Sequence, residues 1–253
     1  MIDTHCHLDA HEFDTDRADV LARAQAAGVA YLVVPAVNVD NFAAVRAICD
    51  QFPACLPAWG LHPVYEAQHK ESDLQQLDAW LHMRRPLAIG EIGLDGWDKR
   101  LDFSRQEYFF SAQLELARSH GLPVLLHLRH AVDAGINQLR RHGIRRGIAH
   151  AFNGSLQQAE RLIDMGFKLG FGGAATYSRA LNLHRLVKAL PLSSIVLETD
   201  APDMSPQWAV GQRNSPEYLP RIAAELAALR DMDVAALVSA CTDNTRTVLD
   251  WHD

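Results

Sequence analysis

The chain has 253 residues, with 24 Lys or Arg against 31 Asp or Glu, so its formal net charge is −7. This balance excludes a protein that holds nucleic acid mainly through a broad basic face, and 48% hydrophobic residues exclude a disordered chain. No apolar run approaches the roughly 18 residues that span a bilayer, the polar start lacks a signal-peptide core, and four cysteines without paired spacing suggest no disulfide framework. We expect a cytoplasmic protein without membrane association or an obligate protein partner.

Short apolar runs alternate with longer amphipathic segments along the chain. Eight runs are apolar or β-branched almost throughout, which is typical of parallel strands buried on both faces. The predicted strands are Ile2–His7, Tyr31–Val37, Cys55–Leu61, Leu87–Ile92, Pro123–Leu128, Gly147–Ala151, Phe167–Phe171 and Ser194–Thr199. The predicted helices between and after them include Arg17–Ala27, Asn41–Gln51, Ser72–Met83, Ser104–His120, Ala131–His142, Arg179–Leu190 and Val234–Leu249.

Capping signals mark the start of three helices. Ser104–Glu107 and Ser155–Gln158 have the residue types of capping boxes, and Ser215 before Pro216 marks a third start. The regular alternation of strand and helix predicts parallel βαβ units. Eight strands in this length favour an α/β fold of the closed (β/α)₈ TIM-barrel type. A doubly wound open sheet is the alternative, but it would usually show a glycine-rich phosphate loop after its first strand. We predict one domain over residues 1–253.

The first chemical signal is the pair His5 and His7 in the first predicted strand. Residues two apart on a strand point to the same face, so two imidazoles could chelate one metal ion. Cys6 faces the other way and is predicted to be a packed thiol. Two ordinary polar side chains are the alternative interpretation of the pair.

Four further residues fall at the carboxyl ends of predicted strands: Glu91, His127, His150 and Asp200. In a TIM barrel those ends meet on one face, where active sites are found. A charged or imidazole group at the end of a buried strand is costly unless it is paired or binds metal. We therefore expect one shared site.

The number and type of these groups suit two divalent metal ions in an open, catalytic arrangement. We assign His5, His7 and Asp200 to the first ion and His127 and His150 to the second, with Glu91 as the bridge. Two such ions can generate a hydroxide and hold the attacking and leaving oxygens, and Asp200 is placed to accept the proton from the water. Zn²⁺, Mn²⁺ and Mg²⁺ all remain compatible with these ligands.

Several residues near these strand ends have two interpretations. Arg129 lies two residues beyond His127 and could hold a phosphate or pair with a carboxylate. His62 could approach the substrate or only form a hydrogen bond within its loop, and Asp95 could orient a ligating histidine or serve as a turn residue. The tryptophans near strand ends could stack an unpaired base or pack in the core; these are Trp59, Trp97 and Trp208.

Six motifs resemble the TatD-family metal-dependent hydrolases, within the wider amidohydrolase barrels. The matching segments are Asp3–Asp9, Gly60–Pro63, Gly90–Asp95, Pro123–His127, His150–Gly154 and Glu198–Pro202. Segments Ser155–Arg161 and Glu198–Met204 look closest to the bacterial YjjV-like branch. The resemblance implies a TIM barrel, divalent metals at the positions named above, and DNase or related hydrolase activity. Gly96, Leu128 and Asn153 depart from residues common in the family, which bears on substrate choice rather than on metal binding.

Three functions are compatible with these residues. The leading one is a metal-dependent phosphodiesterase that acts on DNA, with nucleotides removed from an end. The second keeps the metals and changes the bond, to an ester or amide hydrolase such as a D-aminoacyl-tRNA deacylase. The third is a non-catalytic binding protein stapled by metal, which an open mixed site of His and carboxylate groups disfavours.

Overall fold

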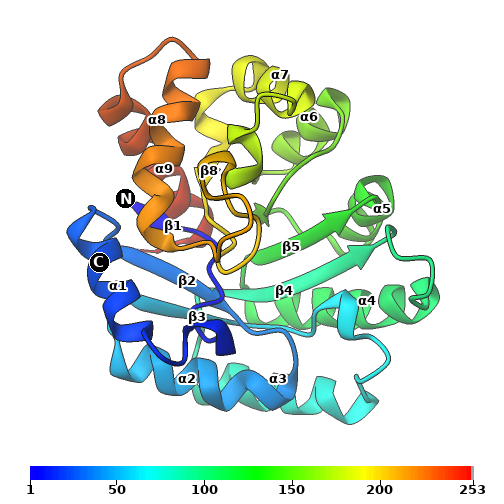
Figure 1. Cartoon of the computed structure of the whole chain (residues 1–253). Helices are drawn as coiled ribbons and strands as arrows, with labels where there is room; N and C mark the ends of the chain where they lie inside the picture. The colour runs from blue at the N-terminus through cyan, green and yellow to red at the C-terminus, as the bar shows by residue number, and fades with distance from the viewer. Residues whose placement is uncertain (252–253) are drawn as a thin grey trace.

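The chain folds into a ring of eight parallel strands surrounded by helices (Figure 1), in a computed structural model that describes residues 1–251. All neighbouring strands are parallel and follow the order of the sequence, β1 to β8. The strands are β1 Ile2–Asp3, β2 Tyr31–Pro35, β3 Cys55–Trp59, β4 Ala88–Asp95, β5 Val124–Arg129, β6 Gly147–Ala149, β7 Phe167–Phe171 and β8 Ile195–Leu197. The predicted (β/α)₈ barrel is confirmed.

The ring is joined between its first and last strands by backbone hydrogen bonds just beyond them. The Thr4 N–H donates to the Leu197 carbonyl at 3.0 Å, and the Asp200 N–H donates to the His5 carbonyl at 2.8 Å. These bonds place His5 and Asp200, which come from opposite ends of the chain, side by side.

Nine α-helices are described within residues 1–251, and they pack around the strands. They are α1 Arg17–Ala26, α2 Phe42–Gln51, α3 Glu71–Met83, α4 Phe103–His120, α5 Val132–His142, α6 Leu156–Asp164, α7 Leu181–Ala189, α8 Leu219–Leu229 and α9 Val234–Leu249. Among them, none combines the length and the apolar character needed to cross a membrane.

The inside of the barrel is apolar at one end and polar at the other. Leu125 and Ile148 belong to a small buried cluster that also includes Val248 and Leu249 at the end of α9. His127 and His150 follow Leu125 and Ile148 by two residues and therefore lie on the same face. The end of α9 therefore seals the barrel near the start of the strands, and the polar groups collect where the strands end.

Two of the three predicted helix starts need correction or refinement. The Ser155–Gln158 capping box is present. The helix expected to open at Ser104 instead begins at Phe103, because the Asp102 carboxylate accepts a hydrogen bond from the Arg105 N–H at 3.1 Å. Ser215 precedes a short 3₁₀ turn, Pro216–Tyr218, without capping it through its side chain.

Most predicted strand ends also differ from the structure. Strands β2, β3, β6 and β8 stop two residues before the predicted end, and the largest differences are in β1 and β4. The β1 ladder stops at Asp3 and not at His7, although the Cys6 N–H still donates to the Val33 carbonyl at 3.0 Å. Strand β4 continues to Asp95, so Glu91 lies inside the strand and not at its end. The β4–β5 register shifts between Ile89 and Ile92, and Glu91 lies within this irregular segment.

Candidate active site

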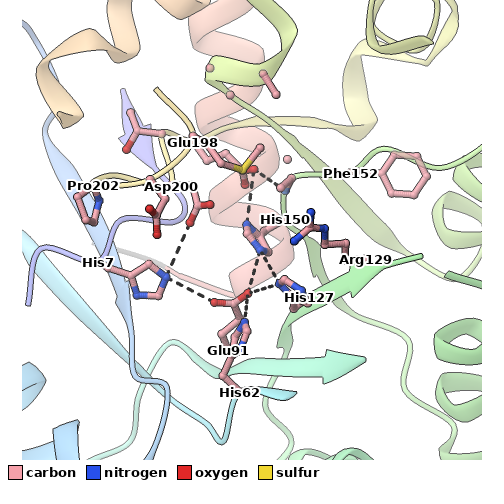
Figure 2. Close-up of a pocket in the computed structure, with 18 of the residues that line it drawn as sticks. His7, His62, Glu91, His127, Arg129, His150, Phe152, Glu198, Asp200 and Pro202 are labelled. Carbon is pink, nitrogen blue, oxygen red and sulfur yellow. Dashed lines mark hydrogen bonds and ion pairs between the residues drawn. The ribbon is translucent and has the colours of Figure 1, made fainter. Parts of the chain in front are cut away.

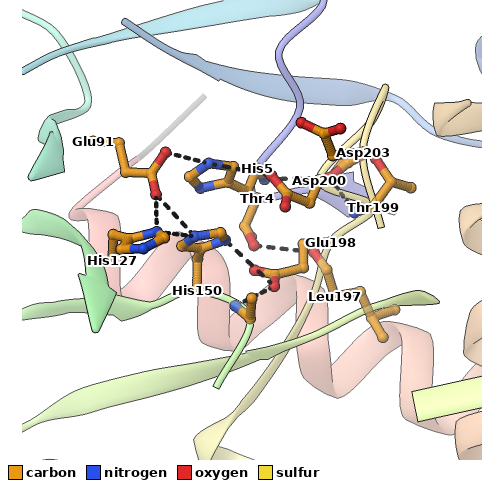
Figure 3. A network of polar contacts seen from close by, with 12 residues as sticks. Thr4, His5, Glu91, His127, His150, Leu197, Glu198, Thr199, Asp200 and Asp203 are labelled. Carbon is orange, nitrogen blue, oxygen red and sulfur yellow. Dashed lines mark hydrogen bonds and ion pairs between the residues drawn. The ribbon is translucent and has the colours of Figure 1, made fainter. Parts of the chain in front are cut away.

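The six residues predicted to bind metal converge at the carboxyl ends of the strands (Figures 2 and 3). The other five surround Glu91, whose side chain lies between imidazoles from several strands. They also line a cavity of about 860 Å³, apart from His5, which is completely buried beside it.

The two oxygens of the buried Glu91 carboxylate face different histidines, and Oε1 also has His62 Nε2 within 3.2 Å. Oε2 lies 3.0 Å from His5 Nε2 and 3.5 Å from His7 Nε2. Oε1 lies 3.0 Å from His127 Nδ1 and 2.8 Å from His150 Nε2. One carboxylate therefore contacts two sets of imidazole nitrogens, one set through each oxygen.

Asp200 completes the first of these clusters. Its Oδ1 lies 3.7 Å from His5 Nε2 and 3.8 Å from His7 Nε2, and the two imidazole nitrogens are 3.3 Å apart. One ligand atom from each of His5, His7 and Asp200 falls within 4.8 Å of the others, as is also true of His5, Glu91 and His150. The site thus holds the donor atoms that a divalent cation needs.

His62 also reaches the site, and its imidazole is held in one tautomer. Its Nδ1 accepts a hydrogen bond from the Val64 N–H at 3.1 Å. Burial lowers the pKa of His62 to about 4, so the ring is neutral at pH 7 and its proton is on Nε2. That nitrogen lies 3.2 Å from Glu91 Oε1, so His62 presents a hydrogen-bond donor to the site, and it also makes the bond within its loop that was the alternative.

A second layer of carboxylates contacts the histidines from behind. Asp95 Oδ2 lies 3.0 Å from His127 Nε2, which is the hydrogen bond anticipated for Asp95. Glu198 Oε1 accepts from the Ala151 N–H at 2.5 Å and lies 3.8 Å from His150 Nδ1. Glu198 is not among the predicted site residues, although its position two residues before Asp200 places it on the same face.

A buried network fixes the segment that carries Asp200. Asp3 Oδ1 accepts from the backbone N–H of His5 at 3.2 Å and of Thr199 at 3.0 Å. The Thr199 hydroxyl donates to Asp3 Oδ2 at 2.5 Å, and Asn214 Nδ2 donates to the Thr199 carbonyl at 2.8 Å. The start and the end of the barrel are therefore tied together at the site.

The charges of the buried groups depend strongly on one another. Burial, helped by His150, lowers the pKa of His5 to about 3. Burial also opposes protonation of His7 and His150, but the neighbouring Glu91 and Asp200 carboxylates outweigh it and raise their pKa values to about 9 and about 10. Without a metal, the site therefore carries protons on imidazoles that a bound cation would displace.

The two candidate substrate contacts differ in setting. His62 is buried, whereas Arg129 is exposed at the cavity rim. No carboxylate within residues 1–251 pairs with the Arg129 guanidinium, so the ion-pair alternative is not seen; its Cζ lies 4.9 Å from the centroid of the Trp97 ring. Trp59 is fully buried against Phe42, so the packing alternative holds for it.

Within residues 1–251, one other group of possible metal-binding side chains lies away from the strand ends. Asp78 and His82 are on α3, and His120 ends α4. The His120 Nε2–Asp78 Oδ1 distance is 2.7 Å, as expected for an ordinary hydrogen bond.

A barrel with imidazoles and carboxylates gathered at the ends of its strands is the architecture of a TIM-barrel hydrolase of the metal-dependent type. The family model described as TatD related DNase matches residues 2–250. The chain is 42% identical over 252 residues to the "Uncharacterized metal-dependent hydrolase YjjV" of Escherichia coli, covering 98% of this chain and 97% of the relative.

Two further comparisons agree. The crystal structure of E. coli YJJV, a TatD homologue, superimposes with a TM-score of 0.96 at 41% identity, over 100% of this chain and 98% of that one. The "3'-5' ssDNA/RNA exonuclease TatD" of Salmonella typhimurium is 31% identical, with 99% of both chains covered. The chain belongs to the TatD family and is a hydrolase of that family, as its motifs implied.

Proposed function

We propose that this protein is a deoxyribonuclease that hydrolyses phosphodiester bonds at the end of a single strand, with two divalent metal ions. His5, His7 and Asp200 would hold one ion, and His127 and His150 the other, with Glu91 shared between them. The observation that carries the proposal is the Glu91 carboxylate. Its Oε2 faces the imidazoles of His5 and His7, and its Oε1 faces those of His127 and His150 as well as His62.

The residues present fit such ions. Imidazole nitrogen and carboxylate oxygen suit Zn²⁺, Mn²⁺ and related cations. His5 Nε2 and His7 Nε2 are 3.3 Å apart, and His150 Nε2 and His127 Nδ1 are 3.4 Å apart. Nitrogens this close cannot both direct a proton at each other, whereas their lone pairs can bind one cation between them.

When bound, the two ions would activate a water at neutral pH and neutralise the developing charge on phosphate oxygens. Asp200 would accept the proton of the attacking water, because its carboxylate lies at the site of the first ion, with Oδ1 3.7 Å from His5 Nε2. His62 would donate from Nε2 to an oxygen of the reacting group. Asp95 would keep the His127 ring in place through the 3.0 Å contact with Nε2.

The substrate class follows from the rim of the cavity and from the relatives. Arg129 offers a guanidinium without a carboxylate partner in residues 1–251, suited to a phosphate. A cavity of about 860 Å³ is in the range of pockets for small ligands, so it suits the end of a strand better than a duplex along its length. Relatives that carry nuclease names, such as the Salmonella exonuclease, support the same substrate.

The test is turnover of an end-labelled single-stranded DNA oligomer by chelator-stripped protein, with Mg²⁺, Mn²⁺ or Zn²⁺ added back singly. Asp200→Asn is the matched inactive control. Metal-dependent shortening from one end, absent in the variant, is the expected result. A protein that binds two metal ions per chain but cleaves no DNA would overturn the proposal and direct the search to carbonyl substrates such as aminoacyl-tRNA.

A further inference from the structure

An exposed tryptophan stands beside the cavity where β4 and β5 end. Trp97 is 57% exposed, and its backbone N–H donates to Asp95 Oδ1 at 2.8 Å. The other oxygen of the same carboxylate contacts His127 Nε2 at 3.0 Å. One side chain therefore fixes both a proposed metal ligand and the loop that presents the indole.

Two cavity-lining residues of β5 and its following turn contact the indole. The Arg129 Cζ lies 4.9 Å from the centroid of the Trp97 ring, and the His130 ring centroid lies 4.9 Å from it at an interplanar angle of 48°. The Gly96 N–H donates to the Arg129 carbonyl at 2.8 Å, which continues the β4–β5 pairing into this loop. We refer to Trp97, Arg129 and His130 as the rim platform.

The rim platform differs from the surroundings of the other tryptophans, all of which lie within the described residues. Trp97 is the tryptophan with a largely exposed side chain, whereas Trp59 is fully buried. Trp208 is half-buried, with Arg221 Cζ 4.0 Å from its ring centroid. Neither Trp97 nor Trp208 itself lines the cavity, but Trp97 contacts two residues that do, Arg129 and His130.

The chemistry of the rim platform matches one ligand class. An exposed indole provides a flat surface on which any unpaired base can stack, and a neighbouring guanidinium strengthens the contact and can hold a phosphate. A base paired in a duplex has no free face to offer except at an end. The combination therefore selects single-stranded nucleic acid over a bare phosphodiester or a duplex.

We propose that the rim platform is a binding subsite for an unpaired nucleobase, with Arg129 on the phosphate next to it, so that the strand enters the cavity over the loop between β4 and α4. This inference rests on the proposed nuclease function and adds the path of the substrate. It makes Trp97 a determinant of single-strand binding, with no part in the chemical step.

The test measures binding of a decathymidylate in an Asp200→Asn background, where substrate is bound without turnover. Trp97→Ala is expected to weaken binding by about 5- to 150-fold, the range for loss of one base–aromatic stack. Trp97→Phe is expected to keep most of the affinity while it abolishes the quenching of tryptophan fluorescence by the oligomer. Trp208→Ala is the matched control and is expected to change neither quantity.

An oligomer of the same length with abasic residues separates stacking from phosphate contacts, because Trp97→Ala and its parent are expected to bind it equally. Unchanged affinity and unchanged quenching in both Trp97 variants would overturn the inference. Cleavage of the decathymidylate by the protein with Asp200 intact is measured in parallel. If cleavage persists while the Trp97 variants behave like the parent, only the subsite is wrong; if the parent neither binds nor cleaves the oligomer, the proposed function fails as well.

Discussion

Replacing Glu91 by glutamine tests the proposed bridge with almost no change in side-chain volume. Glutamine keeps one oxygen and puts an NH₂ group, which has no lone pair to offer, where the other oxygen was. One of the two nitrogen clusters, at 3.0 and 3.5 Å from Oε2 or at 3.0 and 2.8 Å from Oε1, therefore loses its shared ligand. The remaining cluster keeps a neutral ligand in place of an anionic one.

The expected loss follows from the role of that ligand. Changing residues that only orient metal ligands already lowers affinity by about 10- to 100-fold, so losing a direct ligand should lower the affinity for one ion by more than about 100-fold. Removing one ion from the reaction forfeits several kcal/mol of charge stabilisation, so kcat should fall by at least about 1000-fold. The barrel should stay folded, because the replacement is nearly isosteric.

The assay combines metal content per chain after dialysis, the circular dichroism spectrum, and hydrolysis of the DNA oligomer. Glu12→Gln is the matched control, since Glu12 lines the same cavity but contacts His11 and none of the proposed ligands. We expect two ions per chain in the control and about one or fewer in Glu91→Gln. A folded Glu91→Gln protein that retains two tightly bound ions and normal turnover would refute the bridging role.

Three further predictions concern other residues of the site. Asp95→Asn should lower metal affinity by about 10- to 100-fold by loosening His127, measured by competition with a chelating dye; unchanged affinity would argue against its orienting role. Metal binding at pH 7.5 should release about two protons per chain, because His7 and His150 have pKa values raised to about 9 and about 10. The number of protons released should fall as the pH rises through these values. The measurement is a titration with metal in weak buffer, and the absence of proton release would contradict the prediction. Arg129→Ala should raise KM for DNA more than it lowers kcat and should flatten the dependence on salt, whereas an unchanged KM would exclude a phosphate contact.

The sequence was sufficient to predict that the six proposed metal ligands meet at one site, because two simple rules govern their placement. Parallel strands in a barrel end on the same face, which brings His127, His150 and Asp200 together. Alternation along a strand puts His5 and His7 on one side and Cys6 on the other, and Cys6 is indeed fully buried. Neither rule depends on detailed packing.

The parts that could not be predicted depend on contacts between distant segments. Glu91 sits inside β4 because the pairing with β5 continues past it to Asp95 and Arg129, with a register shift between Ile89 and Ile92. The sequence of one strand does not reveal how far its partner pairs with it. Asp102 rather than Ser104 caps the start of α4, where Glu66 Oε1 also accepts from the Asp102 N–H at 2.9 Å. Both residue types are good caps, so only the tertiary contact decides between them.

The exposure of Trp97 illustrates the same limit at the cavity rim. Its sequence position after a strand was compatible with core packing or with a place at the site, as for Trp59. In the structure the Trp97 N–H donates to Asp95 Oδ1 at 2.8 Å, and the indole is exposed. Side-chain direction in such a loop is set by hydrogen bonds that the sequence does not specify.

The most direct test of the account is anomalous X-ray diffraction from crystals loaded with Mn²⁺ or Zn²⁺, recorded above and below the absorption edge of the metal. We expect two peaks at the carboxyl ends of the strands, about 3.5–4 Å apart, one beside each oxygen of Glu91. A single peak, or peaks only at the Asp78–His82–His120 group on the outer helices, would contradict the proposal that Glu91 is shared by two metal ions.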